Sequence, residues 1–220
     1  MKKSVNTFSV LLYTVSGILF AVYITLSFLA VSPLYRVAVL LIICAAVYFG
    51  SLLLIRGGAE REKAMKITFL IFFALYALLL GNLLFFDKYF GRTGFIASGE
   101  AVTDIRLRPF ATITGFLKSI KTGGHTKEQI FTNLLGNLVA FMPLSLFLPL
   151  YFKGRRRIIP FILVVMALVL AVEVLQVALK TGVGDVDDLI LNTLGALLAF
   201  YILKIPPLKK LIIRFTKLEY

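Results

Sequence analysis

Long apolar runs divide the chain into segments with the length of a membrane-spanning helix. A helix needs about 20 residues to cross a hydrocarbon core about 30 Å thick. Six runs approach or exceed this length, at residues 8–30, 36–55, 66–86, 130–152, 158–179 and 187–204. The pattern predicts an all-α fold, a polytopic membrane helix bundle of about six transmembrane helices.

The longest connection between these runs covers residues 87–129. Residues 104–110 within it alternate polar with apolar side chains and include a proline, which indicates extended chain with Arg106 and Arg108 on one side. A short amphipathic piece follows at residues 114–120. We therefore expect a small extramembrane segment in this connection and no second domain.

Composition supports a membrane protein and excludes several alternatives. Of the 220 residues, 60% are hydrophobic and 16% charged, and the mean hydropathy is +0.94, outside the usual range of a soluble domain. The formal net charge of +13 arises from basic residues in short runs beside apolar segments, which favours anionic membrane lipid as the partner and not nucleic acid. Cys44 and His125, each the only residue of its type, cannot build a metal centre by themselves.

The distribution of basic residues predicts the orientation. With the N-terminus inside, 15 of the 24 Lys and Arg residues fall on the inner side and 9 on the outer side. The dense runs at residues 153–157 and 204–217 lie beside span ends, so both termini are expected to be cytoplasmic. The outer share is large because the connection 87–129 carries seven of the nine, which require a separate explanation.

Polar side chains recur on the fourth apolar run. Asn133 and Asn137 are four residues apart and share a helix face, with Gly136 placed to admit a neighbouring helix. For these asparagines alone, hydrogen bonding to a partner helix is the favoured interpretation. Pro143 is expected to kink this span and to free the carbonyl oxygen of Val139.

The fifth run carries Glu173 and Gln176, three residues apart and therefore on one face. An ionised glutamate in hydrocarbon is costly, so it must be protonated, paired or in contact with water. A functional role is therefore favoured for Glu173.

The sixth run opens with three acidic residues, Asp185, Asp187 and Asp188. Acidic residues suit a helix N-terminus, and Asp185 or Asp187 is an ordinary capping candidate, but capping accounts for one aspartate and not for three. Asp188, Asn192 and Gly195 form one stripe along the helix.

All these polar groups lie toward the outer ends of the last three spans in the predicted topology. This arrangement is expected to form one site from Asn133, Asn137, Glu173, Gln176, Asp188 and Asn192, with Arg106 and Arg108 on the same side.

Four motifs, in this order along the chain, together resemble the VanZ-like family: Leu107-Arg108-Pro109-Phe110; Asn133, Gly136, Asn137, Phe141 and Pro143; Glu173 and Gln176; and Asp185, Asp188, Asn192 and Gly195. The resemblance covers about residues 66–204. It implies a multi-pass protein of the bacterial cytoplasmic membrane, similar to a member that gives low-level resistance to teicoplanin. Teicoplanin is a lipoglycopeptide that binds cell-wall precursors at the outer surface.

The resemblance also suggests a division of the chain. Residues 1–60 would be an extra N-terminal pair of transmembrane helices, residues 61–205 a VanZ-like membrane domain with the outer loop 87–129, and residues 206–220 a basic cytoplasmic tail. Many members carry an arginine three residues before the first aspartate. Here that position is Gly182, and Lys180 is the nearby candidate to replace the charge.

Three functions are compatible with these features. The first is an envelope protein that lowers the access of lipoglycopeptides to their targets, with a lipid-linked cell-wall precursor or the lipoglycopeptide itself as partner. The second is an enzyme acting on a lipid-linked phosphorylated envelope precursor. The third is a transporter, ranked lowest because the polar groups cluster at one surface and not at the midplane.

The expected roles follow from side-chain chemistry. Arg106, Arg108 and Lys180 would hold phosphate, and the amides of Asn133, Asn137, Gln176 and Asn192 would contribute to substrate binding. Glu173 and Asp188 are the candidate acid/base residues, because the chain offers no serine or cysteine nucleophile constellation and no histidine pair. A divalent ion between Glu173, Asp185 and Asp188 is a weaker hypothesis. The sequence identifies no cofactor.

Overall fold

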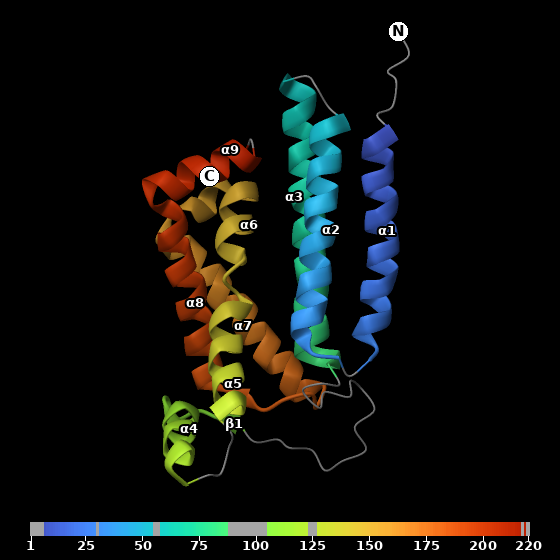
Figure 1. The fold of residues 1–220 in the computed structure, drawn as a ribbon. Helices are drawn as coiled ribbons and strands as arrows, with labels where there is room; N and C mark the ends of the chain where they lie inside the picture. The colour runs from blue at the N-terminus through green and yellow to red at the C-terminus, as the bar shows by residue number, and fades with distance from the viewer. Residues whose placement is uncertain are drawn as a thin grey trace. The chain divides into compact units, whose positions relative to one another are not determined.

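The structure is a computed structural model and describes residues 7–29, 31–54, 58–87, 105–122, 127–216 and 218. These residues are mainly helical (Figure 1). Six helical segments among them are long and apolar enough to cross a membrane: Thr7–Ser27, Pro33–Leu54, Glu60–Phe86, Asn133–Tyr151, Ile158–Ala178 and Val186–Lys204. The predicted all-α polytopic bundle is confirmed.

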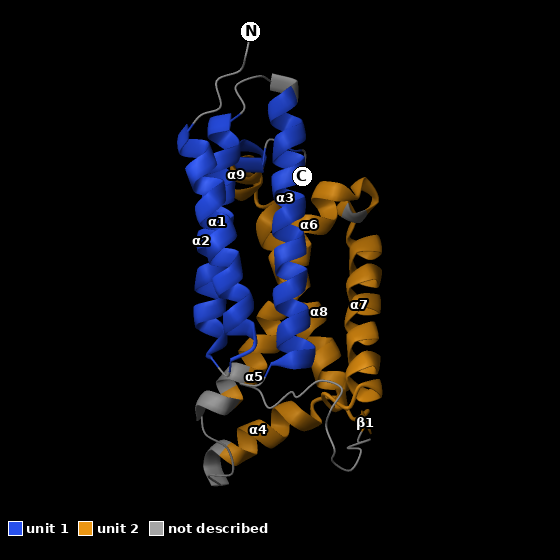
Figure 2. Cartoon of the chain, turned by 90° about the vertical axis from the view of Figure 1, so that its right-hand side faces the viewer, with its two compact units in different colours: residues 1–93, 213–219 blue, residues 94–212, 220 orange. Residues whose placement is uncertain are grey.

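The chain forms two compact units, residues 1–93 with 213–219 and residues 94–212 with 220 (Figure 2). The first unit contains α1 (Thr7–Ser27), α2 (Pro33–Leu54), α3 (Gly58–Gly81) and a π-helical continuation of α3, η1 (Asn82–Phe86). Helix α2 packs against both α1 and α3. Their shared core consists of Tyr23, Leu40, Ile43, Val47, Leu75 and Leu79.

Hydroxyl groups connect the three helices of the first unit. The Ser51 hydroxyl lies 2.8 Å from the Tyr13 hydroxyl of α1 and 2.7 Å from the Thr68 hydroxyl of α3. Gly50 allows α1 to approach, because a Cβ atom added there would lie 3.3 Å from the Tyr13 ring. Since lipid tails provide no hydrophobic force between spans, such contacts hold membrane helices together.

Arg36 and Asp87 form an ion pair in the first unit, with both side chains 0% exposed. Arg36 also donates to Asn82 Oδ1 at 2.6 Å and to the carbonyl oxygen of Val31 at 3.1 Å. The pair connects the start of α2 to the residue after η1. It explains one of the basic residues on the predicted outer side, because Arg36 is buried against an acid instead of facing solvent.

The second unit contains two short strands and most of the remaining helices. They are β1 (Ile105–Arg106), α4 (Ala111–Thr122), α5 (Lys127–Ala140), α6 (Leu144–Tyr151), the 3-10 helix η4 (Lys153–Arg156), α7 (Ile158–Ala178), β2 (Gly184–Asp185), α8 (Val186–Lys204) and the start of α9 (Pro206–Thr216). Helix α8 packs against α5, α6 and α7. At its core the rings of Phe161 and Phe200 stack with centroids 4.3 Å apart.

The fourth span is divided into α5 and α6 by a turn at residues 141–143. This break confirms the expected kink at Pro143, which precedes α6. The expected free carbonyl oxygen of Val139 is wrong, since it accepts the Met142 N–H at 3.1 Å. The chain compensates for proline with a tighter hydrogen bond one residue earlier.

The glycine at the close helix contact is Gly195 and not Gly136. A Cβ atom added at Gly195 would overlap the carbonyl oxygen of Leu138, so the α8 backbone lies directly against α5. A Cβ atom added at Gly136 would meet nothing within 4 Å. The prediction for Gly136 is therefore wrong, because an asparagine-rich sequence does not reveal which helix supplies the small residue.

We predict that Gly195→Ala lowers the stability of the second unit by about 1–3 kcal/mol or more, because the new methyl group must push α8 away from α5. The measurement is thermal unfolding of the purified protein in detergent. Gly136→Ala is the matched control and should be neutral or slightly stabilising, since alanine favours helix and meets open space. Equal melting temperatures for the two variants would contradict the close contact.

We predict that Arg36→Met destabilises the protein by about 3–5 kcal/mol, because it leaves the Asp87 carboxylate buried beside an apolar side chain. The double variant Arg36→Met with Asp87→Leu should recover much of this loss, since no buried charge then remains. Thermal unfolding of both single variants and the double variant completes the cycle. Strictly additive effects would show that the two residues do not interact.

Candidate functional site

A short parallel ladder brings the segment that contains Arg106 and Arg108 to the turn between the last two spans. Strand β1 pairs with β2, with Ile105 opposite Gly184 and Arg106 opposite Asp185. Of the extended chain predicted for residues 104–110, residue 104 lies outside the described residues, Ile105 and Arg106 form the strand, and residues 108–110 turn into α4. The amphipathic piece predicted at residues 114–120 is present within α4.

Asp187 is fully buried at the site, with 0% of its surface exposed. Its carboxylate accepts the Phe110 N–H, the Thr112 N–H at 2.8 Å and the Ile113 N–H at 3.1 Å. These groups form the start of α4, where helical N–H groups have no partner within the helix. A carboxylate at the first residues of α8 therefore caps a different helix, with favourable charge at its positive end.

Asp185 joins three elements through its two carboxylate oxygens. One oxygen accepts the Asp187 N–H at 2.9 Å, which makes Asp185 the N-cap of α8 as expected. The other accepts the Thr112 hydroxyl and lies 4.0 Å from an Arg106 guanidinium nitrogen. The Asp185 N–H in turn donates to Glu173 Oε2 at 3.1 Å, so the buried glutamate of α7 supports the start of α8.

Asp188 connects α8 to α5. Its carboxylate accepts from the side-chain amide of Asn137, and its main-chain oxygen accepts from the Asn192 amide at 2.7 Å. Asn192 Oδ1 is buried without a hydrogen-bond partner among the described residues. The structure therefore brings together Asn137, Asp188 and Asn192, and it accounts for all three aspartates by separate contacts.

Strain is concentrated at Phe110, the last residue of the Leu-Arg-Pro-Phe motif. Its φ of 62° lies in the left-handed region, which is uncommon for a bulky residue. This conformation is held at both peptide groups, because the Phe110 N–H donates to Asp187 and its carbonyl oxygen accepts the Thr114 N–H at 2.9 Å. Phe110 is 55% exposed, so the strained backbone places an aromatic residue at the surface.

The end of α7 is a Schellman motif with Lys180 in the left-handed position. The Thr181 N–H donates to the Gln176 carbonyl oxygen at 2.9 Å, and the Lys180 N–H to that of Val177 at 3.1 Å. Lys180 has a φ of 57°, and its side chain is exposed. Gln176 is buried, and a Cβ atom added at Gly182 would lie 3.4 Å from it.

Two predicted site residues lie apart from this network. Asn133 and Arg108 are exposed, and no hydrogen bond between described residues joins either of them to the three aspartates. Within the same part of the chain, no three His, Cys, Asp or Glu side chains are arranged to hold a metal ion. Glu173, Asp185 and Asp188 instead show contacts with protein donors.

Sequence reasoning named Asp187 only as a capping candidate at the start of the sixth run, and it missed the contact with α4 and the part played by Thr112. The partners of Asp187 are main-chain N–H groups of a segment 74 to 77 residues earlier, and main-chain groups leave no mark in a residue pattern. The only signal was the clustering of three aspartates at one helix start, more than a single cap requires.

These features define a multi-pass membrane protein in which an acidic turn, residues 185–188 between α7 and α8, holds the segment of β1 and α4. The VanZ/LLP1 family matches residues 72–208, a range that includes the whole acidic turn, its Asn137 partner and the β1 and α4 segment. The chain belongs to this family. No curated protein and no solved structure matches it.

We predict that Asp187→Ala releases the start of α4. Loss of a helix cap costs up to about 2 kcal/mol, so the Thr112 and Ile113 amides should exchange hydrogen up to about 30-fold faster, as measured by mass spectrometry or NMR. Asp188→Ala is the matched control, because it removes a neighbouring carboxylate that binds Asn137 instead. Unchanged exchange at these amides in Asp187→Ala would refute the cap.

Proposed function

We propose that this VanZ-like protein acts in the bacterial cytoplasmic membrane and lowers susceptibility to lipoglycopeptides such as teicoplanin. The observation that carries the proposal is the attachment of β1 and α4 to the acidic turn: β1 pairs with β2, and Asp185 and Asp187 accept hydrogen bonds from Thr112 of α4. In this arrangement a cationic and apolar segment is held at the ends of α7 and α8. We place this end on the outer side, and both termini in the cytoplasm, from the distribution of basic residues.

The fastened segment has the chemistry to bind an anionic ligand that carries a lipid chain. The Arg106 side chain is 52% exposed, and Arg108 is exposed as well. Between and beside them, Leu107 is 75% and Phe110 55% exposed. Guanidinium groups bind phosphate in bidentate fashion, and the apolar side chains suit the membrane interface. A lipid-linked cell-wall precursor fits this combination. A precursor bound by this segment would be less accessible to teicoplanin.

An enzyme acting on the same phosphorylated precursor is the alternative. Asp188 favours it, because this carboxylate is only partly buried and binds a side-chain amide. Asp185 and Asp187 favour the binding function, because they accept main-chain N–H groups and are used in holding the segment. Glu173 and Asp188 would be the acid/base pair of such an enzyme. Arg106 and Arg108 would hold the phosphorylated precursor in both the enzyme and the binding function.

We predict that expression in a susceptible Gram-positive host raises the minimal inhibitory concentration of teicoplanin, and that Arg106→Gln with Arg108→Gln abolishes most of the increase. Each charge-assisted contact is worth about 1.5 kcal/mol or more, about tenfold in affinity. Lys118→Gln is the control, since it removes an exposed positive charge from α4 outside the arginine pair.

Two outcomes would argue against this function. One is unchanged susceptibility when the wild-type protein is verified in the membrane by fractionation. The other is a lipid intermediate that accumulates without the protein and disappears with wild type, but not with Asp188→Asn or Glu173→Gln. That second result would favour the enzyme.

A further inference from the structure

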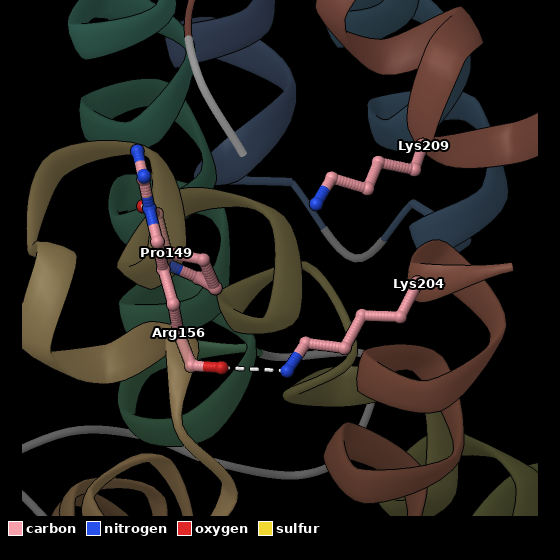
Figure 3. A pocket seen from close by; sticks show the side chains of 4 residues that line it. All are labelled: Pro149, Arg156, Lys204 and Lys209. Atoms are coloured by element: carbon pink, nitrogen blue, oxygen red, sulfur yellow. Dashed lines mark hydrogen bonds between the residues drawn. The ribbon is translucent and has the colours of Figure 1, made fainter. Parts of the chain in front are cut away.

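A cationic cavity lies at the far end of α8 from the acidic turn. It has a volume of about 330 Å³ and is lined by Pro149 of α6, Arg156 of η4, Lys204 of α8 and Lys209 of α9 (Figure 3). All four residues belong to the second unit. Helix α8 has 19 residues, so its two ends are on the order of 27 Å apart. The cavity is therefore separate from the site described above.

The walls of the cavity are held by specific contacts. Lys204 Nζ donates to the Arg156 carbonyl oxygen at 2.6 Å and lies 4.0 Å from the centroid of the Phe200 ring. Arg156 Nε lies 3.3 Å from the Pro149 carbonyl oxygen. Figure 3 shows Lys204 and Lys209 extending from α8 and α9 toward the side on which Arg156 lies. The cationic groups are thus brought together from three elements by the fold.

The described residues that line this cavity are strongly basic. Three of the four lining residues are cationic, and none of these described residues is acidic. Bringing like charges to one cavity raises the free energy, and a bound anion lowers it. The volume also falls within the range of small-ligand sites, about 300–1,000 Å³.

The position of the cavity identifies the kind of anion. Lys204 ends one candidate span, and Arg156 lies in the connection between two others, Asn133–Tyr151 and Ile158–Ala178. The cavity therefore lies at the level where spans leave the hydrocarbon and lipid phosphates are located. Helix α9 has a strongly amphipathic pattern, Pro-Pro-Leu-Lys-Lys-Leu-Ile-Ile-Arg-Phe-Thr, typical of helices that lie along this interface.

We propose that this cavity binds the phosphate group of an anionic phospholipid at the membrane face opposite the acidic turn. Arg156 and Lys209 supply the charge-assisted hydrogen bonds, and Lys204 fixes the Arg156 main chain while adding its own charge. The lipid tails extend along the apolar sides of the spans. This inference concerns a different end of the unit and does not depend on the proposed function.

The test uses the full chain purified in a non-ionic detergent and titrated with short-chain phosphatidylglycerol by calorimetry. We expect saturable binding of one phosphatidylglycerol, and at least tenfold weaker binding of the matching phosphatidylcholine. Inorganic phosphate is titrated separately. Binding of inorganic phosphate as tight as that of phosphatidylglycerol would overturn the assignment to lipid, as would equal binding of both lipids.

Two double variants with the same loss of charge locate the site. Arg156→Gln with Lys209→Gln should weaken phosphatidylglycerol binding at least tenfold. Lys153→Gln with Lys210→Gln is the matched control, because both lysines are exposed nearby and neither lines the cavity. Equal weakening in the two would show diffuse attraction and overturn the proposal. Should the first variant unfold, Arg156→Lys with Lys209→Arg keeps the charges, and loss of saturable binding in this folded variant would overturn it as well.

Discussion

The Asp187 carboxylate is the contact on which the rest of the second unit's polar end depends. It is buried, and it satisfies the three N–H groups at which the chain turns into α4. Burial of a charge is costly unless fixed donors surround it, and those N–H groups would be costly without an acceptor. The carboxylate and the N–H groups therefore satisfy each other's hydrogen-bonding requirement. Without this carboxylate, the segment that carries the arginines would depend on the two-residue ladder and on the contacts of Asp185 with Thr112 and Arg106.

The neighbouring acidic residues extend this hydrogen-bond network to further elements. Asp185 adds the Thr112 hydroxyl and the start of α8, Glu173 supports the Asp185 main chain, and Asp188 reaches α5 through Asn137. The first unit uses the same physical solution at Arg36 and Asp87, where two ions lose all contact with solvent and take each other as partners. The charged side chains named here are therefore held by specific partners, which lowers the cost of burying them in a membrane protein.

Much of the architecture could be predicted from sequence, because span length and hydropathy are fixed by the bilayer itself. The pairing of Asn137 with Asp188 was within reach, since both lie at helical spacing near the same end of their spans. The role of Asp187 was not, because its partners are main-chain groups distant in sequence. Gly136 was expected at a helix contact, and Gly195 was assigned only to a stripe on its own helix, because spacing identifies a face and not the neighbour against it. Arg36 was counted only as one of the basic residues on the outer side, because its partner, Asp87, is 51 residues away.

The distance along the chain between Asp187 and its partners sets an order of assembly. The Thr112 N–H precedes the carboxylate that binds it by 75 residues, and α5, α6 and α7 lie between them in the chain. During synthesis, the start of α4 leaves the ribosome long before α8 exists. Its N–H groups must stay with water until the final hairpin is threaded into the membrane. The contacts that hold the start of α4 are thus formed last. They can form only after the spans that contain α5 to α8 have been inserted.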